Sequence, residues 1–271
     1  MASRSSTVPS EDRGFLLGDG LFETVRLWRG RPFRLDRHVA RLERGAELVG
    51  IPIPGDLRSK IAKEITAARD QDAVLRITLT RGSGAGLAPP GRPRSRLVVG
   101  VRPLAQSPSQ AQRGLRTVFR GRVDERSLVA TLKALGYLER IQAFRLARGA
   151  GADDALLRNS EGRVIEGSSS NLFALRGDTL LAPGPKQGAL PGITRSVILE
   201  VAERLGLEVE ERAPRREDLV RATEVMLSST LRGIVPVVDV ERRKIGTGTP
   251  GSVFRDLAAG YGETVRSELG L

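Results

Sequence analysis

Short strand-like segments and amphipathic helices alternate along this chain without a regular βαβ repeat, which favours an α+β fold over a doubly wound sheet. LFETVRLW (21–28) and AVLRITLTR (73–81) show the period-two alternation of half-buried strands, and apolar residues recur at helical spacing from residue 35 onward. The 271 residues allow two domains of ordinary size. We therefore predict an α+β fold made of two α/β domains.

A polar, turn-rich segment near the middle of the chain, PLAQSPSQAQRG (103–114), is the best candidate for a linker. It separates a small N-terminal domain (1–108), which begins with a polar tail (1–13), from a larger C-terminal domain (109–271). No apolar run approaches the roughly 20 residues that span a bilayer, and the N-terminus lacks the apolar core of a secretory signal. We expect a cytoplasmic protein without a membrane partner.

Lysine and arginine total 44 against 32 acidic residues, which gives a net charge of +12. The basic residues are dispersed and aromatic residues make up only 4% of the chain, so we expect no nucleic-acid partner. The chain has no cysteine, and His38 is its single histidine. This excludes thiolate chemistry and multi-histidine metal sites, and argues against a Ser-His-Asp triad. We predict no metal site.

Five of the 44 basic residues are lysines, and Lys133 stands apart from the other four. It lies in SLVATLKALGYL, where nearly every neighbour is apolar or small, whereas the others occur in polar, loop or amphipathic-helix contexts. An apolar pocket destabilises an ammonium ion, which makes such a lysine a candidate for Schiff-base catalysis. The alternative is a lysine that extends from a strand end toward solvent.

Three other segments could supply polar groups to a site. In LPGITR, Thr194 stands at the start of an amphipathic helix behind Gly192, which suits either an anion site or an ordinary N-cap. In VIEGSSSNLF, Glu166 directly follows an apolar strand, where it is either buried beside a cation or exposed at the strand end. LSSTLRGIVPV places hydroxyl groups at a strand end. Together with Lys133, these are the groups that a phosphorylated aldehyde cofactor needs.

The order of these motifs resembles that in the class IV (fold-type IV) pyridoxal-phosphate enzymes. The motifs, in chain order, are GDGLFETVR, LDRHVARL, Lys133, GADDALLRNSEGRVIEGSSSNLF, LPGITR and SSTLRGIVPV. That family contains branched-chain aminotransferases, D-amino-acid aminotransferases, R-selective amine transaminases and 4-amino-4-deoxychorismate lyases. The resemblance implies a D-amino-acid aminotransferase-like fold, a cofactor between the two domains and a homodimer.

The resemblance also implies a role for each matching residue. Lys133 would form the aldimine with pyridoxal 5'-phosphate and move a proton between the substrate α-carbon and C4′, with pyridoxamine 5'-phosphate as the intermediate form. Glu166 would pair with the protonated pyridine nitrogen and keep the ring an electron sink. His38 would pack in the helix ahead of the phosphate-binding arginine. The other implied cofactor contacts are Arg41, Leu190, Ile193, Thr194, Ser229 and Thr230.

Departures from the family pattern concern the substrate. The tyrosine that follows the lysine in branched-chain enzymes matches Tyr137 only with a displacement of one position. The Arg-x-His pair of D-amino-acid aminotransferases is absent from the loop TRGSGAGLAPP, which has Arg81 but no histidine. An arginine can bind a carboxylate through two hydrogen bonds. We therefore predict that Arg26 binds the substrate carboxylate, with Arg81 as the second candidate.

These observations favour a pyridoxal-phosphate-dependent aminotransferase that acts on a small-molecule amino donor and a 2-oxo acid, with D-amino acids or relaxed specificity preferred. The alternative is a 4-amino-4-deoxychorismate lyase that releases 4-aminobenzoate and pyruvate. A third hypothesis is a basic binding module that has kept the fold without catalysis, and the presence of Lys133 and Glu166 argues against it.

Overall fold

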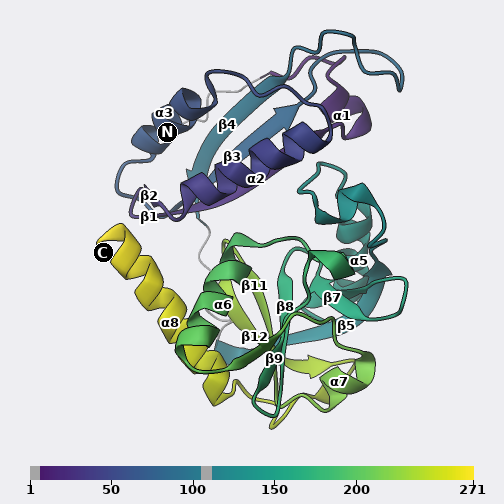
Figure 1. Ribbon diagram of the computed structural model, residues 1–271, viewed down its shortest axis with the longest axis vertical. Coiled ribbons are helices and arrows are strands. Elements are labelled where there is room, and N and C mark those ends of the chain that lie inside the picture. The colour runs from purple at the N-terminus through teal and green to yellow at the C-terminus, as the bar shows by residue number, and fades with distance from the viewer. Residues whose placement is uncertain (1–6, 105–111) are drawn as a thin grey trace. The chain divides into compact units, whose positions relative to one another are not determined.

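The computed structural model describes residues 7–104 and 112–271, and Figure 1 shows the path of the chain through its helices and strands. Residues 1–6 of the predicted tail and residues 105–111 of the predicted linker lie outside the described residues. No helix within the described parts of the chain combines the length and the apolar character that a membrane span requires.

The chain divides into two compact units, Met1–Ala105 with Leu132–Tyr137, and Gln106–Thr131 with Leu138–Leu271. The sequence predicts one domain boundary, after residue 108. The structure differs in that the later segment Leu132–Tyr137 belongs to the first unit. That segment returns because its backbone bonds to β1: the N–H of Phe22 donates to the carbonyl of Lys133 at 2.9 Å. Each unit therefore holds part of the set of residues that the sequence marks as functional.

The first unit is built on a four-stranded antiparallel sheet in the order β2-β1-β3-β4. Its strands are β1 (Gly20–Trp28), β2 (Arg31–Pro32), β3 (Ala73–Thr80) and β4 (Arg96–Pro103). Helices α2 (Leu35–Leu48) and α3 (Leu57–Ala68) pack on this sheet (Figure 1). Since side chains alternate along a strand, Leu21 and Val25 of β1 point into one core, which they share with Val39 of α2.

A short helix, α1 (Arg13–Leu17), precedes β1. The side chain of Asp12 caps its first turn, and both Asp12 and Arg13 are buried. Arg13 pairs with Asp19 at 2.8 Å. The last residues of the predicted polar tail are therefore part of the folded unit, because their charges find partners inside it.

The second unit contains a nine-stranded sheet in the order β10-β9-β8-β11-β12-β5-β6-β7, with β13 paired to β12, among the residues described. β7 also pairs with β8, so six of these strands close into a ring. The strands are β5 (Leu115–Arg122), β6 (Asp154–Arg158), β7 (Val164–Gly167), β8 (Asn171–Arg176), β9 (Thr179–Leu181), β10 (Glu208–Glu210), β11 (Glu224–Ser229), β12 (Gly233–Val240) and β13 (Arg243–Lys244).

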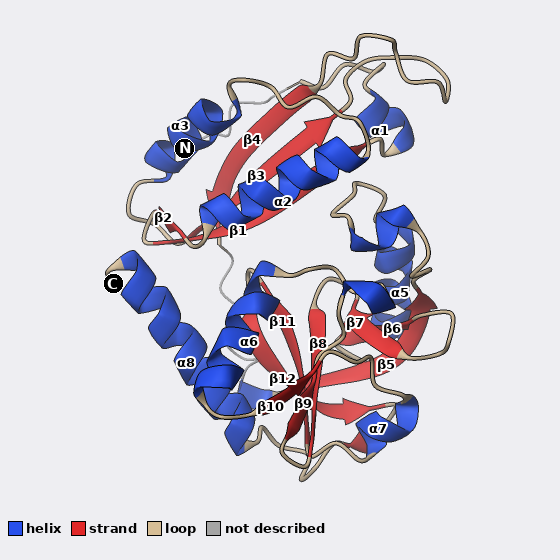
Figure 2. Ribbon diagram, viewed as in Figure 1, coloured by secondary structure: helices blue, strands red, loops and turns tan. Residues whose placement is uncertain are grey.

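Helices and short helical turns surround this sheet (Figure 2). They are η1 (Leu128–Thr131), α5 (Leu138–Gly149), η2 (Pro185–Gln187), α6 (Ile193–Arg204), α7 (Arg216–Val220) and α8 (Ser252–Leu269). Helix α5 packs against β5 and β6, α6 against β11, and α8 against α6 and β12. Leu156, Leu172 and Leu227, from three strands of the ring, belong to one buried apolar cluster.

Both units mix helices with sheets, which confirms the predicted α+β fold class. The sequence DALLRNSEGRVIE (154–166) predicts a hairpin with a turn at NSEG, and β6 and β7 form it. Apolar spacing also predicts helices from residues 138, 193 and 252, which are α5, α6 and α8. From the sequence, Asp36 is a candidate N-cap for the helix that follows it, and this prediction is wrong because Asp36 does not cap α2. The helix begins two residues earlier than such a cap would place it, after Arg34 in a left-handed conformation, so Asp36 lies in the first turn and interacts with the helix dipole.

Candidate active site

Three neighbouring strands of the second unit bring Glu166, Asn171 and Ser228 into one row. Glu166 of β7 pairs with Asn171 of β8, which pairs in turn with Ser228 of β11. Residues that pair across strands point to the same face of a sheet, and all three are buried. Ser228 Oγ has no hydrogen-bond partner in the described part of the protein. The row thus presents a carboxylate and an unsatisfied hydroxyl on one face.

The carboxylate of Glu166 is held from two sides. Nη2 of Arg140, on α5, donates to Oε1 at 2.5 Å, and the backbone N–H of Leu190 donates to Oε2 at 3.5 Å. A buried carboxylate needs such partners to offset its lost hydration. Nothing in the local sequence marked Arg140, because its partner is 26 residues away in the chain. This fixed acceptor suits the protonated nitrogen of a pyridine ring.

Helix α6 begins at Ile193, directly after the loop that crosses this row. Its N-cap, Gly192, is extended and no side chain caps the helix within the described residues, which leaves first-turn N–H groups for an anion. A Cβ at Gly192 would lie 2.0 Å from Oδ1 of Asn171, whose Nδ2 donates to the carbonyl of Leu190. Thr194 is buried in the first turn. This set of donors fits a phosphate group.

Two more predicted phosphate contacts lie beside the row. Ser229 follows Ser228 at the end of β11, and Thr230 begins the turn to β12; both are half-buried. The second unit therefore gathers six of the predicted cofactor residues: Glu166, Leu190, Ile193, Thr194, Ser229 and Thr230. Carboxylate, helix start and hydroxyls match what pyridoxal phosphate requires of a protein.

Lys133 lies in the first unit with its amine against aromatic rings. Its Nζ is 4.6 Å from the ring centroid of Phe22 and 5.9 Å from that of Tyr137. The two rings contact each other edge to face, with centroids 5.1 Å apart. Lys133 is half-buried. Its amine therefore lies beside two aromatic rings.

Arg41, the predicted phosphate-binding arginine, is held by Glu23 inside the first unit. Nε and Nη2 of Arg41 donate to the two carboxylate oxygens at 2.7 and 2.8 Å, and Nδ1 of His38 lies 2.7 Å from Oε2. Burial acts to raise the pKa of Glu23, but hydrogen bonds from His38 and Arg41 outweigh it and lower this pKa to about 2. Burial lowers the pKa of His38. Sequence reasoning missed Glu23, although its inward position between Leu21 and Val25 signals a buried acid.

Glu23 makes the stability of the fold sensitive to acid. Because its folded-state pKa of about 2 lies below the ordinary value of 4.5, it stabilises the fold fully above pH 4.5 and progressively less as the pH falls toward 2. Asp153, whose pKa hydrogen bonds from Arg113 lower to about 2, acts in the same direction. We expect Glu23→Gln to lose less unfolding free energy across this window than the wild type. Denaturant titrations at several pH values measure this, and identical slopes would contradict it.

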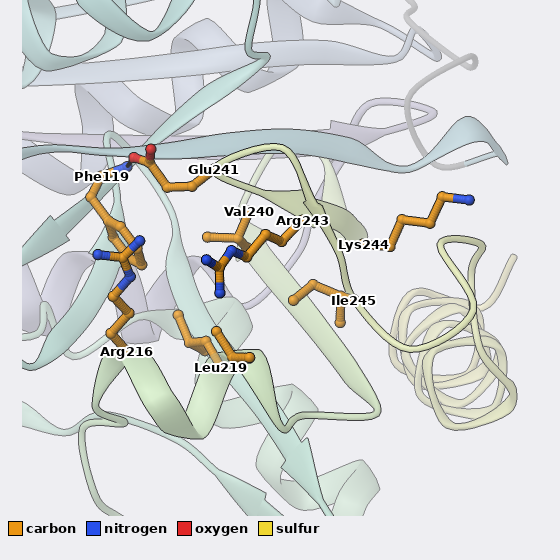
Figure 3. Close-up of a pocket in the computed structure, with 9 residues that line it drawn as sticks. Phe119, Arg216, Leu219, Val240, Glu241, Arg243, Lys244 and Ile245 are labelled. Carbon is orange, nitrogen blue, oxygen red and sulfur yellow. Dashed lines mark hydrogen bonds between the residues drawn. The ribbon is translucent and has the colours of Figure 1, made fainter.

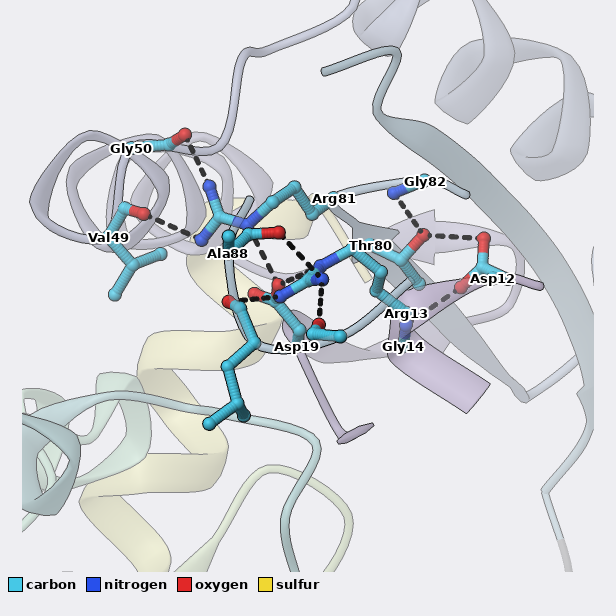
Figure 4. A network of polar contacts seen from close by, with 12 residues as sticks. Asp12, Arg13, Gly14, Asp19, Val49, Gly50, Thr80, Arg81, Gly82 and Ala88 are labelled. Carbon is cyan, nitrogen blue, oxygen red and sulfur yellow. Dashed lines mark hydrogen bonds and ion pairs between the residues drawn. The ribbon is translucent and has the colours of Figure 1, made fainter. Parts of the chain in front are cut away.

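Arg81, the second candidate for the substrate carboxylate, is occupied by contacts within the first unit. Its Nε donates to Asp19 at 2.8 Å, and its two terminal nitrogens donate to the carbonyls of Gly50 and Val49 at 2.7 and 2.8 Å (Figure 4). Asp19 also pairs with Arg13. These contacts tie the loop after β3 to the end of α2, which indicates a structural role for Arg81.

Arg26, the first candidate, lies on β1. Its guanidinium carbon is 3.3 Å from the ring centroid of Trp28, and its Nη2 is 3.6 Å from Oδ2 of Asp72. Asp72 is partly exposed, so this ion pair is weak and does not exclude another anion.

A further pocket lies within the second unit (Figure 3). Phe119, Leu219 and Ile245 line it with apolar surface, and Arg216 and Arg243 add positive charge. It contains none of the residues predicted from the sequence, so it does not enter the candidate site.

Comparison with known proteins places this geometry in a family. A family model described as amino-transferase class IV matches residues 20–240. A D-alanine aminotransferase of Bacillus licheniformis is 30% identical over 278 residues, covering 99% of this chain and 95% of that protein. The chain therefore belongs to the class IV aminotransferase family.

Solved structures agree with this assignment. The branched-chain amino acid aminotransferase of Escherichia coli matches with a TM-score of 0.90 and 26% identity, covering 97% of this chain and 91% of that one. A 4-amino-4-deoxychorismate lyase from Pseudomonas aeruginosa matches with a TM-score of 0.84 and 32% identity, covering 98% and 97%. The predicted family, the fold-type IV architecture and a pyridoxal-phosphate enzyme are confirmed. The roles of individual residues stay predictions.

Proposed function

We propose that the protein is an aminotransferase that moves an amino group from an amino acid to a 2-oxo acid, with D-amino acids or relaxed specificity preferred. The observation that carries this proposal is Glu166, a buried carboxylate fixed by Arg140 beside the uncapped start of α6. One unit thereby offers a partner for a pyridine nitrogen and donors for a phosphate. The D-alanine aminotransferase of Bacillus licheniformis, similar over nearly the whole chain, supports the preference for D-amino acids.

The proposed roles follow from these surroundings. Bound pyridoxal phosphate supplies a ring that draws electrons from the substrate α-carbon. Lys133 would hold the cofactor and carry the proton away from that carbon, and the rings of Phe22 and Tyr137 limit the hydration of its amine. Glu166 would hold the proton on the pyridine nitrogen. Leu190 would pack on the ring, and the phosphate would be bound by Arg41, Ile193, Thr194, Ser229 and Thr230.

A 4-amino-4-deoxychorismate lyase is the second candidate. The lyase from Pseudomonas aeruginosa, 32% identical over 98% of this chain, favours it. Such an enzyme would use the same cofactor and lysine, but would eliminate pyruvate and release 4-aminobenzoate instead of transferring the amino group.

Absorption spectroscopy of the holoenzyme separates the two candidates. An aminotransferase should lose the visible band of the bound cofactor when D-alanine, L-leucine or an R-amine is added alone, and should regain it with a 2-oxo acid. A lyase should keep the band and form 4-aminobenzoate from aminodeoxychorismate. A band that no amino donor bleaches would contradict amino transfer.

We also propose that the protein is a homodimer, as the resemblance implies. Support comes from apolar residues on the outer face of α5, where Leu138, Ile141 and Phe144 are 69%, 57% and 43% exposed, and from Leu128 and Val129 of η1. Exposed apolar side chains that recur at helical spacing, as on α5, are typical of an interface. Sedimentation of the holoenzyme should give twice the mass of the chain. A cytoplasmic location stays a prediction from the sequence.

A further inference from the structure

The sheet of the first unit carries an arginine, Arg76, that pairs with no acidic residue in the described structure. Because side chains alternate along β1, Glu23 faces α2 whereas Phe22 and Thr24 face the other side. Thr24 pairs with Arg76 of β3, so the Arg76 side chain shares the face of Phe22. Its hydrogen bonds reach only the hydroxyls of Thr24 and Thr78, at 3.5 and 3.4 Å.

Phe22 connects this arginine to Lys133. The guanidinium carbon of Arg76 is 3.5 Å from the Phe22 ring centroid, and Nζ of Lys133 is 4.6 Å from the same centroid. The two cationic groups are therefore at most about 8 Å apart. An α-amino acid carries its carboxylate one carbon away from its amino nitrogen. A substrate whose nitrogen reacts beside Lys133 can thus place its carboxylate at Arg76.

The two arginines selected from the sequence are less suitable. Arg81 already donates to Asp19 and to two backbone carbonyls. Arg26 is four residues beyond Phe22, about 13 Å along the strand, and Asp72 offsets part of its charge. Arg76 is exposed on its sheet face, which leaves its guanidinium accessible to an anion.

We propose that Arg76 binds the substrate α-carboxylate and thereby selects amino acids over amines that lack one. The inference rests on the proposed aminotransferase function. A guanidinium binds a carboxylate through two charge-assisted hydrogen bonds, and removing such contacts costs about 10–100-fold in binding. The loss should appear in KM for amino acids and be absent for amines.

The test compares D-alanine with isopropylamine, in which a methyl group replaces the carboxylate, as amino donors for the holoenzyme. Arg76→Ala should lower kcat/KM for D-alanine by about 10–100-fold, mainly through a higher KM. The kcat/KM for isopropylamine should stay within about twofold of the wild-type value. Arg76→Lys should give an intermediate loss, because an ammonium keeps the charge but lacks the planar fork. Arg58→Ala, which removes an exposed arginine of α3, is the control for net charge and should match the wild type.

Two outcomes would overturn the inference. An active wild type whose Arg76→Ala and Arg76→Lys variants keep wild-type selectivity, or lose both donors equally, would overturn the assignment of Arg76 and leave the proposed function intact. A wild-type holoenzyme that accepts no amino donor at all would overturn the proposed function together with this inference. If Arg76→Ala does not fold, the same two donors are compared between the wild type and Arg76→Lys, and a loss confined to D-alanine supports the assignment of Arg76.

Discussion

Replacing Lys133 by alanine should lower kcat for amino transfer by about 10²–10⁴-fold, the usual contribution of one proton-transferring side chain. Lys133 has its amine against Phe22 and Tyr137, and the other four lysines occur in polar, loop or amphipathic-helix contexts. No arginine can substitute for it, because a guanidinium stays protonated. Steady-state rates with a fixed amino donor and 2-oxo acid measure the effect.

Lys63→Ala is the matched control for this variant. Lys63 is exposed on α3, and its removal changes the net charge by the same amount, so we expect wild-type rates. A Lys133→Ala enzyme within tenfold of the wild type would exclude Lys133 as the proton carrier.

Replacing Glu23 by alanine should lower the free energy of unfolding by about 3–5 kcal/mol, the usual cost of breaking a buried ion pair. The variant leaves Arg41, which is 8% exposed, without the carboxylate that holds two of its nitrogens. The cost is high because Arg41 stays charged in the interior. Denaturant titration at neutral pH measures the loss.

Two comparisons make this second prediction specific. Asp36→Ala breaks an exposed ion pair with Arg58, and should cost no more than about 1 kcal/mol. The double variant Glu23→Ala/Arg41→Met should lose less unfolding free energy than Glu23→Ala alone, because it also removes the buried guanidinium whose charge Glu23 balances. A single variant that is no less stable than Asp36→Ala would show that the buried pair contributes little.

Local periodicity predicts most of this fold. The alternation along β1 and β3 and the helical spacing in α2 reflect which residues face the core. That pattern can be recognised within a short stretch of sequence, without knowledge of distant residues. Helix α1 was missed because its stability comes from Asp12 and Arg13, whose polar character resembles a solvated tail until their distant partners are known.

Some residues of the candidate site can likewise be predicted from their sequence neighbours, and others cannot. Lys133 and Glu166 stand out because their own neighbours are unusual for a lysine and a glutamate. The roles of Arg140 and Arg76 depend on residues from other elements: Arg140 reaches Glu166 from α5, and Arg76 meets Phe22 through the register of two strands. Such pairings depend on strand register and helix placement, which spacing within one segment does not encode.

The most direct test of the central claim identifies the lysine that holds the cofactor. Borohydride reduction of the holoenzyme fixes pyridoxal phosphate to that lysine, and peptide mass mapping locates the modification among Lys60, Lys63, Lys133, Lys186 and Lys244. We predict one cofactor per chain, attached to Lys133. Attachment to another lysine, or a chain that carries no cofactor after reconstitution with pyridoxal phosphate, would contradict the account.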